Sequence, residues 1–347
     1  MTVVLVIVAL SVLILIHELG HFLTARLFKV RVEEFGIGFP PKLFSRKKGE
    51  TEYSVNALPF GGFVRIFGEN ESEKEGEMPA DSFPAQPAWK RALILAAGVV
   101  THIVLGWIIL SVVLSVGVPF HPVIVGTAEN SPAAEVLESG DIVLKVSSGD
   151  ASAEGMRLEE FIGFVDDRKG EEIVLDVQRD GDEMSFALTP RVDPPEGEGA
   201  LGVELSEMGA DPVSFPGSLW EGARQTWSIL EAVVMSFVFL LTNVFTHPEV
   251  LEGVSGPVGI VSVASQASQL NFMYFLQLMA IIALNLVILN LIPFPALDGG
   301  RLLMILVEKI KGSPVSTKVQ MAVNGVGFLL LILLMVVVTV QDIGRMF

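Results

Sequence analysis

The 347-residue sequence contains no cysteine. Disulfide frameworks, thiolate zinc sites and cysteine nucleophiles are therefore all excluded. A metal site in this chain must use His, Asp or Glu side chains, and only five His are present. Basic residues are also scarce, because 23 Lys and Arg stand against 40 Asp and Glu. This acidic balance argues against nucleic acid as a partner.

Hydrophobic residues are abundant, at 51% of the chain, and the mean hydropathy is +0.58. Both values exceed those of an ordinary soluble protein. Each of four apolar runs reaches the ~20 residues that a helix needs to cross a bilayer. The runs are Val3–Phe28, Ala92–Val118, Phe272–Leu297 and Val319–Val340. The sequence therefore predicts a polytopic α-helical membrane protein with four transmembrane helices.

A fifth apolar stretch, Trp227–Phe245, is shorter and carries Glu231 and Asn243. It follows an amphipathic segment, which favours a helix at the membrane interface over a fifth span. The first apolar run is not typical of a cleaved signal peptide, because it has no basic start and no small-residue cleavage site.

Lys and Arg predict the orientation in the membrane. Residues 25–91 hold eleven of them and residues 301–318 hold four, so both loops are expected in the cytoplasm. Residues 119–272 hold 7 Lys and Arg against 26 Asp and Glu. With four spans, this acidic part and both termini lie outside the cytoplasm.

The most informative motif is HELGH at residues 17–21, inside the first apolar run. On a helix, His17 and His21 lie at i and i+4, so their imidazoles share one face and can bind one metal ion. Glu18 lies about 100° around the helix, where it can activate water at the metal without being a ligand. A charged residue inside a span costs about 2.5–3.5 kcal/mol of insertion free energy. This cost favours a functional role for the motif. The alternative is that the motif only marks the cytoplasmic end of the helix.

A catalytic zinc ion usually takes three protein ligands, so a third His or carboxylate is expected near another span. Asp298 is the leading candidate, in the stretch NLVILNLIPFPALDGGRLL at residues 285–303. The Pro-Phe-Pro sequence before it breaks or kinks a helix, and the Gly-Gly pair after it permits a close backbone approach. The alternative is that Asp298 caps the helix that begins near Gly299. The presence of HELGH favours the interpretation of Asp298 as the third metal ligand.

HELGH in the first span, together with NLIPFPALDGG in a later one, resembles the site-2 protease family of intramembrane zinc metalloproteases. Within that family the sequence is most similar to the bacterial regulators of sigma-E protease. The resemblance implies zinc held by His17, His21 and Asp298, with Glu18 as general base. It also implies an endopeptidase of a bacterial inner membrane, with its active site towards the cytoplasm. Its expected substrate is a single-span membrane protein, such as an anti-sigma factor, already trimmed by another protease.

The resemblance further implies that Asn290, and also Asn285, engages the substrate or the developing oxyanion. A side-chain amide suits this role because it can donate a hydrogen bond; the alternative is a hydrogen bond between helices. One departure lies in the second span, where the family pattern Ala-Gly-Pro-x-x-Asn is replaced by AGVVTH at residues 97–102. His102 is then either an additional polar group near the metal or a partner of a neighbouring helix.

Residues 32–67 alternate in polarity and carry turn residues, with strands expected at Glu34–Phe39, Tyr53–Ala57 and Phe63–Phe67. The region resembles the family's β-hairpin that re-enters the membrane beside the metal. Such a hairpin would hold an unwound substrate by adding it to a sheet edge. Four glycines would permit the close approach: Gly36, Gly38, Gly61 and Gly62. The alternative is a hairpin on the cytoplasmic surface.

The acidic part of the chain predicts an α+β unit, with two short helices at Ala133–Glu138 and Leu158–Asp167. Residues 131–146, SPAAEVLESGDIVLKV, are similar to a PDZ domain's short helix, Gly-Asp pair and strand. The family assigns such a domain a gating role; the alternative is a generic extracytoplasmic module. The expected divisions are 1–118 (two spans and the hairpin), 119–206 (PDZ domain), 207–271 (linker and interfacial helix) and 272–347 (two spans).

Two other functions compete with a zinc protease. A membrane scaffold with relic protease motifs would have no need of Glu18 beside two His. A divalent-metal transporter would carry polar ligands along several spans, whereas the other apolar runs are nearly free of carboxylates. Both are therefore less favoured.

Overall fold

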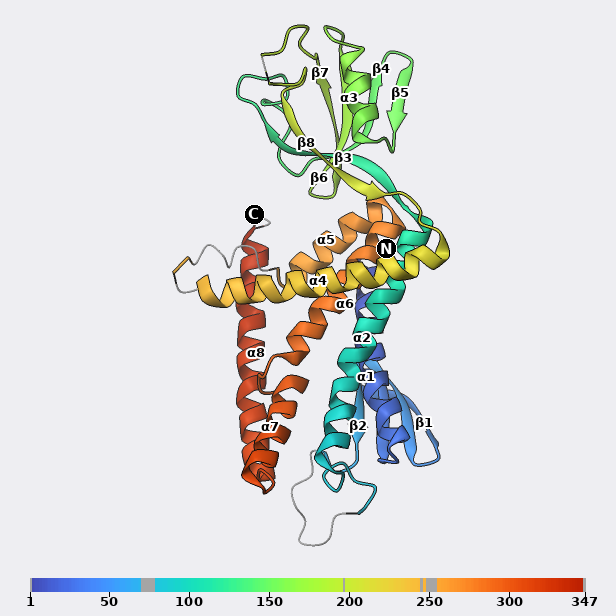
Figure 1. The fold of residues 1–347 in the computed structure, drawn as a ribbon, viewed down its shortest axis with the longest axis vertical. Helices are drawn as coiled ribbons and strands as arrows, with labels where there is room; N and C mark the ends of the chain where they lie inside the picture. The colour runs from blue at the N-terminus through green and yellow to red at the C-terminus, as the bar shows by residue number, and fades with distance from the viewer. Residues whose placement is uncertain (1, 70–78, 196, 244–245, 248–254, 346–347) are drawn as a thin grey trace. The chain divides into compact units, whose positions relative to one another are not determined.

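The computed structural model describes residues 2–69, 79–195, 197–243, 246–247 and 255–345. The chain divides into two compact units, drawn as ribbons in Figure 1. The first, which we call the helical unit, consists of Met1–Ser111, Leu219–Ser265 and Phe275–Phe347. The second, the sheet unit, consists of Val112–Ser218 and Gln266–Tyr274.

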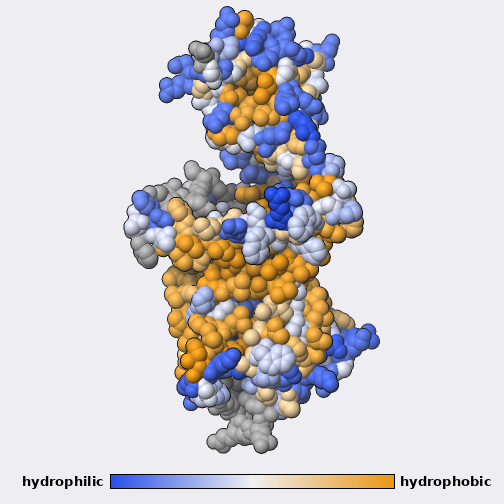
Figure 2. Space-filling view, viewed as in Figure 1, coloured by the Kyte–Doolittle hydropathy of each residue, from blue (hydrophilic) through white to orange (hydrophobic). Residues whose placement is uncertain are grey.

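Helices dominate the first unit. They are α1 (Thr2–Leu27), α2 (Ala88–Val116), α4 (Phe215–Asn243), α5 (Pro257–Leu270), α6 (Phe272–Leu291), α7 (Asp298–Lys311) and α8 (Thr317–Arg345). Among the described residues, α1, α2, α4, α6 and α8 are long and apolar enough to cross a membrane. Figure 2 shows hydrophobic residues over most of the visible surface of this unit. Exposed apolar surface on this scale is stable only in lipid, so the chain is a polytopic membrane protein, as predicted.

Helix α4 contains the stretch that the sequence placed at the interface, of which residues 244 and 245 lie outside the described part. One side of α4 packs on the unit. Gly222 and Thr226 are buried, and Ile229 packs against a small hydrophobic cluster formed by Leu110, Ala280 and Leu284. Three charged residues share a different side, by their spacing along the helix: Glu221, Arg224 and Glu231. Figure 1 shows α4 running across the direction of α2 and α8. These features support an interfacial helix, and the count of four spans stays a prediction.

The long strands β1 (Val32–Lys48) and β2 (Thr51–Ile66) pair antiparallel with several register shifts. Because of these shifts, the first part of β1 pairs on both edges. Phe35, for example, lies opposite Tyr53 on one side and opposite Val64 on the other. The last part of β1 then pairs with the start of β2, up to Lys48 opposite Thr51. The hairpin is therefore folded into a small sheet in which residues 61–66 form one edge.

That edge lies alongside α1. Ser11 Oγ donates a hydrogen bond to the Pro59 carbonyl at 2.7 Å, and a Cβ on Gly61 would lie 3.0 Å from the Ile14 side chain. Further along, the Val64 amide donates to Glu18 at 3.0 Å. Since these α1 residues lie within a candidate span, β2 runs beside the membrane-spanning part of α1 and not beyond its end.

The second unit is built on a six-stranded sheet. Its strands are β3 (Val118–Thr127), β4 (Ile142–Ser148), β5 (Ala151–Glu154), β6 (Ile173–Arg179), β7 (Asp182–Leu188) and β8 (Val203–Ala210). Their order is β7-β6-β4-β3-β8, and β5 pairs with β4. Helix α3 (Leu158–Asp166) contributes Phe161 and Val165 to a core of aliphatic residues from the sheet. The predicted α+β organisation is thus present.

One local expectation in the sheet unit needs correction. Residues 133–138 form turns and not a helix. The Asp141 carboxylate accepts a hydrogen bond from the Glu138 amide, and Gly140 has φ +99°, so the chain turns away after one turn. Strand β5 is a short segment, ASAE, with neither β-branched nor aromatic residues, and its pairing with β4 stabilises it. The assignment as a PDZ domain stays a prediction.

Candidate metal centre

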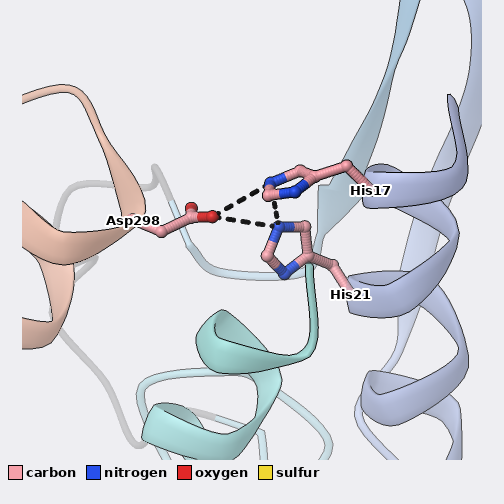
Figure 3. Close-up of side chains that lie close together, drawn as sticks. All are labelled: His17, His21 and Asp298. Carbon is pink, nitrogen blue, oxygen red and sulfur yellow. Dashed lines mark hydrogen bonds and ion pairs between the residues drawn. The ribbon is translucent and has the colours of Figure 1, made fainter. Parts of the chain in front are cut away.

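The two histidines of HELGH lie on one face of α1, as their spacing predicted. Their Nε2 atoms are 3.0 Å apart, and both imidazoles are buried. The Asp298 carboxylate approaches from α7, with Oδ2 3.0 Å from His17 Nε2 and 3.3 Å from His21 Nε2. Figure 3 shows the three side chains converging from two helices. Residues separated by more than 270 positions in the sequence therefore meet at one point.

The backbone between α6 and α7 brings Asp298 to this point. Helix α6 ends at Leu291, before the two prolines, and α7 begins at Asp298 itself. The N-cap residue is Leu297, and no side-chain hydrogen bond caps this helix. Asp298 is thus turned to the histidines and does not serve as the cap. The turn is tight, because a Cβ on Gly299 would lie 2.2 Å from the Ile292 carbonyl oxygen.

A backbone contact orients His21. Its Nδ1 lies 2.8 Å from the Ile94 carbonyl oxygen in α2. A carbonyl oxygen only accepts hydrogen bonds, so Nδ1 carries the proton and the Nε2 lone pair points to Asp298 and His17. Fixing the second ring nitrogen in this way is how proteins prepare a histidine for a metal.

These three residues fit a zinc ion. Two imidazole nitrogens and one carboxylate oxygen within 4.8 Å of one another form the only such cluster in the described part of the chain. Ligands about 2.0–2.1 Å from zinc in a tetrahedron lie about 3.3 Å from each other. The observed separations of 3.0–3.3 Å are close to this value. With three protein ligands, one position stays open for water or substrate, as in catalytic zinc sites.

Gly98 in α2 forms one wall of the centre, a role that its place in an apolar run did not indicate. A Cβ at this position would lie 2.5 Å from His17 Cε1 and 2.6 Å from His21 Nε2. Any larger residue would therefore push the imidazoles away from Asp298. The Ala-Gly motif of the second span was the available signal, but without the packing of α1 on α2 it did not point to the metal.

Glu18 is held on the hairpin side of α1. Its Oε2 accepts the hydrogen bond from the Val64 amide in β2. The carboxylate is not among the three clustered ligands. The carboxylate therefore lies beside the sheet edge, and its role as general base stays a prediction.

The two asparagines are not tied to the centre in this structure. The Asn285 side-chain amide donates to the Ile281 carbonyl of its own helix at 2.9 Å. Asn290 is half-buried and makes no side-chain hydrogen bond to the described residues. Their expected contacts with substrate stay predictions.

The four hairpin glycines lie in or next to the close packing of the sheet. A Cβ on Gly36 would lie 2.4 Å from the Phe63 ring, and one on Gly62 would lie 2.7 Å from the Gly36 carbonyl oxygen. Gly38 and Gly61 have φ values of +75° and +72°, which residues with a Cβ rarely adopt. Their structural role is clear, and their role in substrate binding stays a prediction.

Ion pairs hold α7, and with it Asp298, against its neighbours. The Arg91 guanidinium donates to Glu308 at 2.7 Å and so joins α2 to α7. Glu308 is buried and also accepts from the Val315 amide and the Gln320 side chain. Arg301, one turn after Asp298, donates to Glu69 at 2.5 Å. Together these contacts fix the position of α7 relative to the two histidines.

Comparison with known proteins agrees with this geometry. The model of peptidase family M50 matches residues 5–334. A Clostridium perfringens protein, named as a predicted zinc metalloprotease, is 36% identical over 99% of this chain and 98% of its own length. The zinc metalloprotease RasP of Shouchella clausii is 30% identical over 97% of each chain. The regulator of sigma-W protease RasP of Bacillus subtilis is 28% identical over 100% of this chain and 99% of its own length. The chain therefore belongs to peptidase family M50, the site-2 protease family that its two motifs had indicated.

Proposed function

We propose that this site-2 type zinc metalloprotease hydrolyses peptide bonds within the transmembrane segments of single-span membrane proteins. The observation that carries the proposal is the convergence of His17, His21 and Asp298 inside an apolar helical unit, with Glu18 next to them. A centre at this depth has little access to soluble proteins, whereas a substrate in the same bilayer can reach it.

Zinc, when bound by the three ligands, lowers the pKa of water towards ~7 and polarises a carbonyl group. Glu18 supplies the proton transfers. Its carboxylate accepts a proton from the attacking water and then donates it to the nitrogen of the departing amine. The hydrogen bond from Val64 holds one oxygen of this carboxylate in place, so the other is free for the proton.

The sheet edge at residues 61–66 is the proposed substrate site. A peptide bond in a helix is shielded, so the substrate must be unwound before it is cut. An edge strand offers backbone groups that bind an extended chain. Since Val64 contacts Glu18, a strand added at this edge would pass close to the metal. Gly36, Gly38, Gly61 and Gly62 keep this region thin, and Asn290 and Asn285 would contact the bound chain.

The proposed setting is the inner membrane of a bacterium, with four spans and α4 at the interface. The basic loops face the cytoplasm, and both termini and the sheet unit lie outside. The sheet unit would act as a PDZ domain that admits only substrates already trimmed by another protease. The name of the Bacillus subtilis relative, a regulator of sigma-W protease, supports an anti-sigma factor as the substrate class.

The decisive experiment follows cleavage of a model single-span substrate by the purified full-length chain in nanodiscs. Glu18→Gln should reduce the rate at least 10²-fold, because it removes the general base, while zinc stays at about one per chain. Glu231→Gln, which removes an exposed acid from α4, is the matched control and should cleave normally. His17→Ala should lose both zinc and cleavage.

The same measurement separates the rival functions. A scaffold or a metal transporter would be indifferent to Glu18→Gln, and the wild type would not cut the substrate at all. Either result would refute the proposed hydrolysis.

A further inference from the structure

His102 in α2 is a buried polar residue that the proposed mechanism does not use. Its side chain is only 1% exposed, and Nδ1 has no hydrogen-bond partner among the described residues. Leaving a buried polar group unpaired costs about 1–3 kcal/mol. The expected bond to a neighbouring helix is therefore not made, and this cost needs another explanation.

The position of His102 points to the metal centre. It lies one turn after Gly98, so both residues face the same side of α2. Gly98 touches both metal-binding imidazoles. The ring of His102 lies 5.0 Å from the ring of His17, with 31° between their planes. His102 is outside the set of three clustered ligands, so it is a neighbour of the centre and not part of the metal's coordination.

His102 and Glu18 are positioned by different elements beside the metal centre. The Glu18 carboxylate is bound to β2 through Val64, whereas His102 projects from α2 beside His17. In peptide hydrolysis the base acts on the water, and a separate donor must stabilise the charge that develops on the carbonyl oxygen. Of the two asparagine candidates for this donor, Asn285 donates one of its two amide N–H groups to the Ile281 carbonyl within α6, and Asn290 makes no side-chain hydrogen bond to the described residues. His102 would be a donor in addition to them.

We propose that His102 is a catalytic residue, whose imidazole N–H donates a hydrogen bond to the substrate oxyanion. This inference rests on the proposed proteolysis. As the water oxygen bonds to the carbonyl carbon, the π electron pair moves to the carbonyl oxygen and Glu18 takes the water proton. When the C–N bond breaks, that electron pair returns and the proton passes from Glu18 to the amine. The proton of His102 stays on the imidazole throughout.

The test compares His102→Leu, which fills the space without a donor, with His102→Asn, which keeps a side-chain N–H. Each variant is assayed for substrate cleavage, zinc content and affinity for a phosphinic peptide, whose tetrahedral –PO₂–CH₂– group mimics the transition state. His102→Leu should lower kcat and the phosphinic-peptide affinity by a similar factor, about 10²–10³, with KM and zinc content unchanged. His102→Asn should recover most of both losses. Ser111→Ala, a buried polar change further along α2, should match the wild type.

Two outcomes would overturn the inference. If His102→Leu binds the phosphinic peptide as tightly as the wild type, the residue makes no contact with the oxyanion. If both variants lose zinc, His102 holds the metal instead. In either case the wild type would still cleave and Glu18→Gln would not, so the proposed function would stand without this residue.

Discussion

The helical unit and the sheet unit each bury a cluster of ionisable side chains, and the two clusters differ in how they are completed. In the sheet unit, Asp141 is fully buried and both of its oxygens accept hydrogen bonds from Arg179. The same guanidinium also donates to Glu138 and to the Val136 carbonyl. In the helical unit, by contrast, His17, His21 and Asp298 point their ligand atoms at a common centre. His17 Nδ1 and the nearby His102 Nδ1 have no partner among the described residues.

The difference distinguishes a cluster that stabilises the fold from one that we propose binds a metal ion. A buried ion pair whose polar atoms are all hydrogen-bonded needs no further partner. Loss of either residue leaves the other charge buried and unpaired, which strongly destabilises the fold. A cluster whose atoms converge without saturating one another is completed by something that binds there. Mutations in the first kind of cluster should lower the free energy of unfolding. Mutations in the second kind should reduce metal binding and catalysis.

The largest effect is expected from Gly98→Ala. The added methyl group would lie within 2.7 Å of atoms of both imidazoles and would separate them from Asp298. Zinc should fall from about one per chain towards zero and cleavage should be lost, with the fold retained. Metal analysis and thermal unfolding of the purified protein would check this. Gly325→Ala in α8 is the control, since a Cβ there meets open space; equal zinc in both variants would contradict the packing argument.

The complementary change is Arg179→Met in the sheet unit. Asp141 would be left buried without its main partner, so the free energy of unfolding should fall by about 3–5 kcal/mol. Zinc content should not change, because the proposed metal ligands lie in the other unit. Hydrogen exchange of the β4 and β6 amides would locate the loss. A substantial loss of zinc in this variant would show that the two clusters are not independent.

A third test concerns the ion pair between Arg91 and Glu308, which holds the helix that carries the proposed ligand Asp298. Unlike Arg179, Arg91 keeps one nitrogen, Nε, without a partner among the described residues. Arg91→Met should weaken zinc affinity, by up to about 10-fold, because α7 becomes free to shift. Competition with a chelator would measure it. The exchanged pair Arg91→Glu with Glu308→Arg should restore part of the affinity. No change in zinc affinity would limit this pair to general stability.

The smallest effect is a pH dependence in the sheet unit. Burial lowers the pKa of His121, although its hydrogen bond to the Val143 carbonyl opposes this shift. The unfolded chain then binds a proton at a higher pH than the folded chain does. Stability should therefore be full above pH ~6.5 and fall as the pH drops below it, by at most about 1.4 kcal/mol per pH unit. Hydrogen exchange between pH 5 and 8 should show this slope in the wild type and lose it in His121→Gln.

Much of the candidate site followed from short patterns. The spacing of His17 and His21 on a helix, with Glu18 displaced around it, depends only on helical geometry. The prolines and glycines around Asp298 predicted the break between α6 and α7 that the structure shows. The residues 32–67 likewise predicted strands, because their alternation and turns are local features.

Other features could not be predicted locally. The roles of Gly98 and His102 depend on which face of α2 packs against α1, and an apolar span has no polarity pattern that identifies this face. The double pairing of β1 depends on register shifts that its sequence does not encode by itself. The turn at residues 133–138 depends on the Asp141 carboxylate, which is itself held by Arg179 from another strand.

The sequence by itself determined the chemistry of this protein: without cysteine, a metal had to be held by imidazole and carboxylate groups, and the i, i+4 histidines required a helix to present them. Only the tertiary structure decided where that chemistry happens. Helix packing at Gly98, the turn before Asp298 and the β2 edge at Val64 bring together groups that lie far apart in the chain. Such contacts depend on the shapes of several helices at once, and no local pattern contains them.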